Sequence, residues 1–355
     1  MKRRNLILLI ILIVLLVAAI IVFFTRYHIV SYESYGETHY RIERIKGTLK
    51  VLRDFAVNDT ASINKIFLAD KQNNTILLER KNDHWTVNGD NIARRDFVDV
   101  LLETIKDVEV AAPVPKSKLD YVLRSISTNS TKVEIYQDNT LVKTYYVGGV
   151  TPDNKGTYMI LEGSSAPFEM HIPGFTGFLS TRYITDLFEW KDRILFKYSA
   201  SDIKSVSLVF PADPENSFMA VNNGNNSYSL ISLETGKPVT EADPMMIKEF
   251  ISRYKFVGFE SFLNGTTEYQ KLDSILKSPE MCIYTVEDRS GTKKTLKTFS
   301  RPNFKNVYDD EGNFYNNDVD RFYGVINNDK DLVLLQYINF DLLTKKLSDF
   351  RGANP

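Results

Sequence analysis

Side chains that could bind a metal or act as nucleophiles are few and widely spaced in this chain of 355 residues. The histidines are His28, His39, His84 and His171, and the single cysteine is Cys282. A structural zinc site needs Cys and His ligands at short, regular spacings, which these residues lack. The sequence also contains no glycine-rich phosphate loop and no Gly-x-Ser-x-Gly nucleophile turn. We therefore predict no catalytic residue, no metal site and no bound cofactor.

Other polar residues have simpler interpretations. Residues 309–320 offer oxygen ligands of the kind that calcium prefers, but without EF-hand spacing, so we interpret them as a solvated loop. Glu241 and Asp243 precede an expected helix, where N-terminal capping fits better than acid–base catalysis. Cys282 lies in a strand-like run, which favours a small buried side chain over a reactive thiol.

The composition is that of one large or two medium globular domains, with 43% hydrophobic and 25% charged residues. Lys and Arg total 44, and Asp and Glu total 45. Because Lys2, Arg3 and Arg4 precede a long apolar run, residues 26–355 carry 41 basic and 45 acidic side chains. This part has no excess of positive charge to neutralise phosphates, so we expect no nucleic-acid partner.

The apolar run Leu6–Phe24 has 19 residues without charge, proline or glycine. As a helix it would be about 28 Å long, close to the hydrocarbon thickness of a bilayer. A cleaved signal peptide is the alternative, but its apolar region usually has about 7–15 residues before a small-x-small site. We therefore expect a transmembrane helix at 6–24. The basic tail at 1–5 predicts a cytoplasmic N-terminus and an extracytoplasmic main body.

Residues 25–60 are interpreted as a juxtamembrane stalk. Its tyrosines suit the headgroup region of a membrane, and ordinary packing is an equal alternative. These tyrosines are Tyr27, Tyr32, Tyr35 and Tyr40. Residues 41–56 place apolar side chains at spacings near three and four, which predicts a short amphipathic helix.

The two halves of the chain show the same order of expected elements. In each half, a meander of short strands precedes an amphipathic helix, a second short helix, further hairpins and a closing helix. The meander covers 62–88 in the first half and 203–231 in the second, and Lys118-Leu-Asp120 recurs as Lys271-Leu-Asp273. The offset drifts from about 140 to about 153 residues, which is typical of a tandem duplication with loop insertions.

We expect two tandem α+β domains, at 61–195 and 200–350, after the transmembrane helix. Alternation such as Val133 and Ile135 with polar neighbours predicts antiparallel sheets with helices on one face. Trp85 begins a returning strand, so we expect it to be substantially buried with a structural role.

Several runs resemble a known family. They are Asp59–Lys71, Leu78-Glu-Arg80, Trp85–Asn88, Lys132–Tyr136 and Gly156–Gly163. These runs are similar to those of the membrane-anchored bacterial proteins known as domain of unknown function 4340, found in Bacteroidetes. Related domains occur in the auxiliary subunit of gliding-motility ABC transporters, so the resemblance implies an accessory role in the cell envelope.

The resemblance also suggests a modification site. Asp59-Thr60-Ala61 is similar to the Asp-Ser/Thr-apolar acceptor pattern for periplasmic O-glycosylation in Bacteroidetes. Thr60 is therefore a candidate acceptor. Asp273-Ser274-Ile275 has the same pattern, but Ser274 lies on an expected helix and is the weaker candidate.

We therefore expect a single-pass protein of the bacterial inner membrane whose main body is periplasmic. Its expected role is non-catalytic: an envelope accessory or scaffold, associated with a protein partner such as an ABC-type transporter or the gliding or secretion machinery. Residues 6–24 would supply its contact with the membrane. The alternative is a ligand-binding or hydrolytic protein whose site lies in a cleft between the two repeat domains, where titratable residues could converge.

The expected topology can be tested with spheroplasts. Protease added from outside should digest residues 61–350, because the positive-inside rule places them beyond the membrane. Western blotting against a C-terminal tag measures this digestion, with a cytoplasmic protein as the control for closed membranes. Protection of the tagged domains in intact spheroplasts would contradict the topology.

Overall fold

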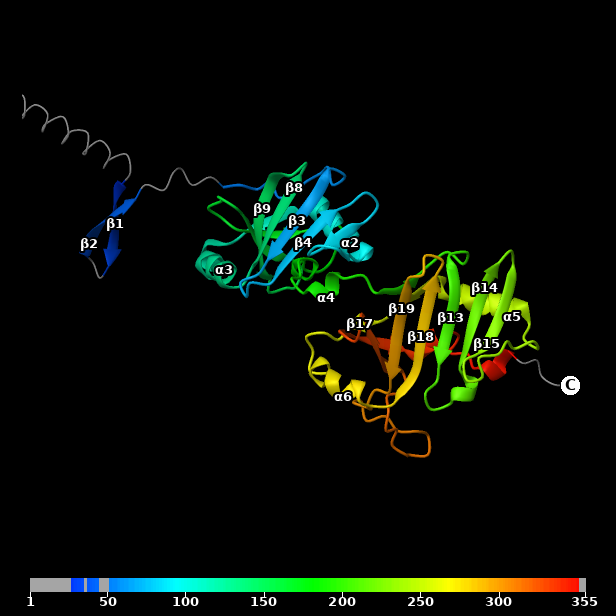
Figure 1. Cartoon of the computed structure of the whole chain (residues 1–355). Helices are drawn as coiled ribbons and strands as arrows, with labels where there is room; N and C mark the ends of the chain where they lie inside the picture. The colour runs from blue at the N-terminus through cyan, green and yellow to red at the C-terminus, as the bar shows by residue number, and fades with distance from the viewer. Residues whose placement is uncertain (1–26, 35–36, 45–50, 351–355) are drawn as a thin grey trace, which may run out of the picture. The chain divides into compact units, whose positions relative to one another are not determined.

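The computed structural model describes residues 27–34, 37–44 and 51–350 (Figure 1). The expected transmembrane helix at 6–24 and the basic tail at 1–5 lie outside these residues. Within the described ranges, no helix is both long and apolar enough to cross a membrane. Most of the regular secondary structure in the described chain is antiparallel sheet, with a few helices, so the predicted α+β class is confirmed.

The chain divides into two compact units that interleave along the sequence. One contains the described residues up to Thr60, together with Thr104–Glu134 and Leu141–Tyr183. The other contains Ala61–Glu103, Ile135–Thr140 and the described residues from Ile184 onward. The domain bounds at 61–195 and 200–350 stay a prediction.

Among the described residues, the first large sheet has nine strands in the order β6-β5-β4-β3-β8-β9-β10-β11-β7. Its strands are β3 (Ile63–Ala69), β4 (Thr75–Arg80), β5 (Trp85–Val87), β6 (Asn91–Ile92), β7 (Glu109–Pro113), β8 (Thr131–Gln137), β9 (Thr140–Val150), β10 (Thr157–Leu161) and β11 (Phe168–His171). The helices of this part are α2 (Arg95–Asp107), α3 (Lys116–Thr128), η1 (Ser180–Arg182) and α4 (Leu187–Trp190).

The second large sheet has eight strands among the described residues, in the order β15-β14-β13-β18-β19-β20-β21-β17. They are β13 (Ile203–Val209), β14 (Phe218–Gly224), β15 (Ser227–Ser232), β17 (Ser261–Phe262), β18 (Glu280–Asp288), β19 (Lys293–Phe299), β20 (Arg321–Ile326) and β21 (Asp331–Gln336). A separate pair joins β12 (Ile194–Lys197) to β16 (Phe256–Gly258). The helices are η2 (Pro214–Asn216), α5 (Pro244–Ser252), η3 (Arg253–Lys255), η4 (Tyr269–Lys271), α6 (Leu272–Leu276), α7 (Tyr337–Phe340) and η5 (Leu347–Phe350).

The two large sheets follow the same order of connection. In both sheets, the first strand of the meander pairs with the strand that follows the second helix. These pairs are β3 with β8 and β13 with β18. Three further antiparallel strands follow, and the last of them, β11 or β21, pairs with a short edge strand, β7 or β17. The sequence pattern had indicated this common order. The sequence pattern did not predict the short strands β6, β7, β12, β16 and β17. With two to five residues each, they are too short to show an alternation of apolar and polar side chains.

Helices cover more than one face of the second sheet, contrary to the expectation from the sequence. Val333 and Leu335 of β21 pack into the core that contains α5, whereas Leu332 and Leu334 pack on the opposite face in the cluster that contains Ile275 of α6. Successive strand residues point to opposite faces, so a strand that is apolar throughout needs a cover on each side. The predicted alternation holds in β8, where Val133 and Ile135 are buried between more exposed neighbours.

The predicted helix at 41–56 is wrong wherever this range is described. Residues up to Arg44 form β2 (Glu37–Arg44), which pairs with β1 (Tyr27–Ser34), and residues 51–57 have no regular secondary structure. Phe55 is fully buried against Tyr145 and Phe168, and Val57 donates its backbone N–H to the carbonyl of Ile105 at 3.0 Å. The apolar side chains of 55 and 57 alternate with more exposed neighbours, as in an extended segment.

Trp190 is the fully buried tryptophan, whereas Trp85, which we expected to be substantially buried, is only partly buried. Trp85 is half-buried because β5 lies near the sheet edge, with the Arg80 guanidinium 4.7 Å above the ring. Trp190 is fully buried, donates its indole N–H to the carbonyl of Ile184 at 2.8 Å, and packs edge to face with Phe97.

Replacing each tryptophan by alanine should show how much its burial contributes to stability. We expect Trp190→Ala to lower the free energy of unfolding by about 3–5 kcal/mol, because it leaves a cavity and an unpaired carbonyl. Trp85→Ala serves as the matched control and should cost only about 1 kcal/mol. Urea unfolding followed by circular dichroism measures both values. Equal losses for the two variants would contradict this assignment.

Candidate functional site

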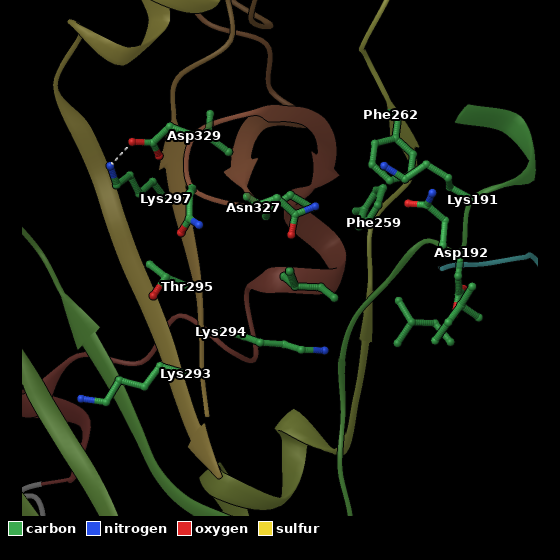
Figure 2. A pocket seen from close by; sticks show the side chains of 17 residues that line it. Lys191, Asp192, Phe259, Phe262, Lys293, Lys294, Thr295, Lys297, Asn327 and Asp329 are labelled. Carbon is green, nitrogen blue, oxygen red and sulfur yellow. Dashed lines mark hydrogen bonds and ion pairs between the residues drawn. The ribbon is translucent and has the colours of Figure 1, made fainter. Parts of the chain in front are cut away.

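The main candidate site is a hollow of about 790 Å³, which we call the lysine hollow (Figure 2). All its lining residues belong to the compact unit that contains residues from Ile184 onward. The polar and charged ones are Asn91, Lys191, Asp192, Lys293, Lys294, Thr295, Lys297, Asn327, Asn328 and Asp329. The apolar ones are Ile92, Ile194, Leu195, Phe259, Phe262, Val325 and Ile326. Its size is within the usual range for small-molecule sites.

The turn between β20 and β21 carries two of the three amide side chains of the hollow. Asn327, Asn328 and Asp329 all have left-handed backbone conformations, with φ of 54°, 56° and 64°. Asn and Asp tolerate this conformation better than other side chains with a Cβ, so the residue types suit the turn. The Asn327 amide donates to the Asp331 carboxylate at 2.6 Å, and this bond ties the turn to the start of β21.

Lys191 enters the hollow from the segment after α4. Its ammonium lies 4.6 Å from the ring centroid of Phe262 and 5.2 Å from that of Phe188, so aromatic faces stabilise its charge. Its carboxylate partner is Asp331, at 3.4 Å, and both side chains are largely buried. Asp331 also accepts hydrogen bonds from Asn264 and Asn327, so Lys191 shares this carboxylate with neutral donors.

Strand β19 supplies the other lysines, and its two faces give them different surroundings. Lys293 and Lys297 lie on one face, where they pair with Glu287 at 3.5 Å and with Asp329 at 2.8 Å. Lys294 lies on the other face, and its side chain extends into the hollow in Figure 2, whereas that of Lys293 points away. In the described part of the chain, Lys294 has no carboxylate within ion-pair distance. Its ammonium is 5.8 Å from the Tyr198 ring.

The electrostatics of the hollow favour binding of a negative group over acid–base catalysis. Burial raises the pKa of the Asp192 carboxyl, against the opposing effect of backbone N–H groups. As the pH falls, Asp192 is therefore protonated before an ordinary aspartate, which removes negative charge from the hollow. Asp329 is held by Lys297. The lining residues bring together ammonium, amide and hydroxyl donors, which suit an anion.

The residues considered from sequence alone are placed elsewhere. Cys282 is buried in β18, as predicted, and burial raises the pKa of its thiol to about 12. Asp243 caps α5 by accepting the backbone N–H of Met245 at 2.8 Å, as predicted. Thr60 lies just before β3 and is half-buried. Among the described residues, no group of three or more His, Cys, Asp or Glu side chains could hold a metal.

A second surface lies between β19 and β20, where residues 302–317 form a β-bridged loop that we call the aromatic hairpin. Isolated bridges join Pro302 to Asn317 and Tyr308 to Phe314. The Asn303 amide is buried and hydrogen bonds to the backbone of Val307 and Tyr315. The hairpin is therefore ordered by internal bonds.

The base of the aromatic hairpin is held by an ion-pair network. Arg301 donates two hydrogen bonds of 3.0 Å to the Glu268 carboxylate and a third to Asp318. Tyr323 donates its hydroxyl to the same Glu268 carboxylate at 2.6 Å. Asp318 is only 6% exposed, so the prediction that residues 309–320 form a solvated loop is wrong at this position. Its partner Arg301 lies outside residues 309–320, so the sequence pattern did not indicate this ion pair.

Large apolar side chains are exposed along the aromatic hairpin. The exposed fractions are 47% for Phe304, 56% for Tyr308, 45% for Phe314 and 40% for Tyr315. The Tyr308 and Phe314 rings pack against each other at 5.4 Å between centroids. These aromatic residues lie within one short segment, 304–315, so the sequence alone could have grouped them. The fold, in contrast, is what brings Lys191 to the lysines of β19.

The comparisons with known proteins give one family. The family described as Domain of unknown function (DUF4340) matches residues 85–275, which is more than half of the chain. The match runs from β5 into α6 and includes strands of both large sheets. Among curated proteins and among solved structures, no match to the chain is found.

The network at the base of the aromatic hairpin predicts a pH-dependent stability. Burial alone raises the pKa of Glu268, but hydrogen bonds from Arg301 and Tyr323 outweigh it and lower the pKa. A lowered pKa in the folded state means that the stabilisation is present above the unfolded pKa, near 4.3, and is lost as the pH falls through the folded value. We expect Glu268→Gln to lose about 2 kcal/mol at pH 7 and to show a flatter acid dependence than the wild type.

Urea unfolding between pH 7 and pH 3 measures this dependence. Glu311→Gln is the matched control, since Glu311 is exposed on the same hairpin and forms no ion pair in the described structure. Its profile should follow that of the wild type. An unchanged acid slope in Glu268→Gln would contradict the role of the network.

Proposed function

The chain belongs to the DUF4340 family, and we propose that it is a non-catalytic accessory or scaffold protein of the bacterial envelope that binds another protein through its aromatic hairpin. The observation that carries this proposal is the exposure of ordered aromatic side chains on that hairpin. Exposed apolar patches on folded domains commonly mark protein interaction sites, and aromatic residues are enriched in such interfaces.

The position of the aromatic hairpin supports an acquired role. In the first sheet, the connection at the same place in the strand order, between β9 and β10, is residues 151–156. In the second sheet, the connection between β19 and β20 is residues 300–320. We propose that the sheets are products of a tandem duplication and that the second copy gained this insertion. These aromatic side chains stay 40–56% exposed although two of them pack against each other, and this exposure favours a binding function.

The charge of the hairpin indicates the chemistry of the partner. Asp309, Asp310 and Glu311 form its tip, and the Asp309 carboxylate accepts the backbone N–H groups of Glu311 and Asn313. A complementary surface would combine an apolar groove for the aromatic rings with basic residues around it. We propose a protein partner with these features, such as a component of an ABC-type transporter or of the gliding or secretion machinery.

Membrane attachment and location form part of the same proposal. The apolar run 6–24 would anchor the chain in the inner membrane of a bacterium of the Bacteroidetes type, with the tail at 1–5 in the cytoplasm and the main body in the periplasm. Thr60 stays a candidate for O-glycosylation in this compartment. An anchored body needs no high intrinsic affinity for a partner in the same membrane, because anchoring raises the effective concentration.

A second candidate function is the binding of a small ligand, and the lysine hollow favours it. Its volume and donor side chains suit a ligand site. Hydrolysis is less well supported, because the hollow combines lysines with carboxylates that are paired or partly buried. No nucleophile with an adjacent general base is evident among its described residues.

Photo-crosslinking in living cells tests the proposed partner contact. A photoreactive phenylalanine derivative at position 308 should form a covalent product with another protein, because Tyr308 is the most exposed aromatic residue of the hairpin. The matched control is position 121, where Tyr121 is 69% exposed on α3. Phe314→Ser should reduce the product from position 308 at least several-fold while leaving the melting temperature nearly unchanged.

Different results would overturn the proposal. Products formed equally from positions 308 and 121, or products with lipid alone, would contradict a protein partner at the hairpin. Turnover of an esterase, peptidase, glycosidase or phosphatase substrate by the purified chain, abolished by a point variant with an unchanged melting temperature, would contradict the non-catalytic role.

A further inference from the structure

We infer that the lysine hollow binds a small organic oxyanion, a molecule that joins a phosphate or carboxylate group to an apolar body. This site is separate from the aromatic hairpin and does not depend on the proposed protein partner. The inference rests on the charge balance of the hollow, the direction of one lysine, and the apolar wall opposite that lysine.

The carboxylates around the hollow compensate its lysines incompletely. Asp331 is 3.4 Å from the Lys191 ammonium and also accepts two amide hydrogen bonds. A direct charge-assisted hydrogen bond is about 2.7–2.9 Å long. Only Lys297 has such a partner in the hollow, at 2.8 Å from Asp329.

Lys294 is the cation best placed to receive an oxyanion. Figure 2 shows its side chain reaching into the space between β19 and the segments that carry Lys191 and Phe262. The described residues place no carboxylate within 4.0 Å of its ammonium. Its positive charge is therefore available to an incoming anion, and no internal ion pair has to break first. Residues 26–355 carry a net negative charge, so the positive charge at this site is opposite in sign to that of the chain as a whole.

The opposite wall suits an apolar ligand body. Phe262 and Phe259 lie together in Figure 2, with their rings in edge-to-face contact at 4.8 Å between centroids. Leu195 and Ile326 add aliphatic surface, and both are largely buried. An apolar wall lowers the local dielectric constant, which strengthens the attraction between Lys294 and an anion. A ligand with an anionic group at one end and a ring at the other would use both parts of the hollow.

The size of the hollow distinguishes this ligand from a macromolecule. A volume of about 790 Å³ accommodates a molecule of metabolite size. The neutral donor Asn328 also lines the hollow and can complete the coordination of an oxyanion. Phosphate and carboxylate groups would both accept hydrogen bonds from such donors, and the experiment below distinguishes which group is preferred.

Isothermal titration calorimetry on the full-length chain in uncharged detergent micelles tests the inference. The probes are phenyl phosphate, benzoate, inorganic phosphate and phenyltrimethylammonium. We expect phenyl phosphate or benzoate to bind more tightly than inorganic phosphate, and the cation not to bind. The tighter of the two aromatic anions identifies the preferred group. Binding should weaken with added salt, because it depends on charge.

Adjacent lysines of β19 provide matched variants. Lys294→Gln should weaken binding of the preferred anion about tenfold, the effect of one lost charge-assisted hydrogen bond. Lys293→Gln makes the same chemical change one residue away, where the side chain points out of the hollow, and should change affinity less than about twofold. Lys294→Arg keeps the charge and should retain most of the affinity. The melting temperature of each variant confirms that it is folded.

Three results would overturn the inference. The first is no binding of any anionic probe by the wild type at low salt. The second is an equal loss in Lys294→Gln and Lys293→Gln, which would indicate diffuse attraction to surface charge. The third is binding of phenyltrimethylammonium as tight as that of the anions, which would show that the aromatic wall alone attracts the probes.

Discussion

Burial on both faces of β20 and β21 is the constraint on which the second half of the molecule depends. Every residue of β21 from Asp331 to Leu335 is buried, and Phe322–Ile326 of β20 are buried as well. Because alternate strand residues point to opposite faces, two separate covers are required, and they contain α5 on one face and α6 on the other. Gly324 is needed in this packing, since a Cβ there would lie within 3 Å of Leu335, Leu296 and Val333 side chains.

This doubly covered hairpin also separates the two candidate surfaces. Strands β19, β20 and β21 are antiparallel neighbours, so the connection between β19 and β20 emerges at one end and the turn between β20 and β21 at the other. The first end carries the aromatic hairpin, and the second end contributes Asn327 and Asp329 to the lysine hollow. A rigid core between the surfaces lets each acquire its own binding chemistry without disturbing the packing that supports it.

The two sheets differ in their connections rather than in their strand order. In the first sheet, α3 packs against Tyr146 of β9 and Tyr158 of β10. These strands correspond to β19 and β20 of the second sheet, against which α6 packs. The differences lie in connections: a short turn at 151–156 in one sheet and a long, aromatic connection at 300–320 in the other. The DUF4340 match covers part of each sheet and ends before both the aromatic hairpin and the lysines of β19.

The sequence by itself determined the elements whose pattern is local. Alternation of Val133 and Ile135 with polar neighbours predicted the strand β8, and helical spacing predicted an amphipathic helix after each meander. The Asp243 cap and the burial of Cys282 followed from neighbouring residues. Only the tertiary structure decided which tryptophan is central, that Asp318 is buried against Arg301, and that Lys191 and Lys294 share one hollow. The physical reason is the separation in sequence of the residues that make contact. Periodicity reports the surroundings of a residue along its own strand or helix. These contacts depend on elements that are far apart in the chain.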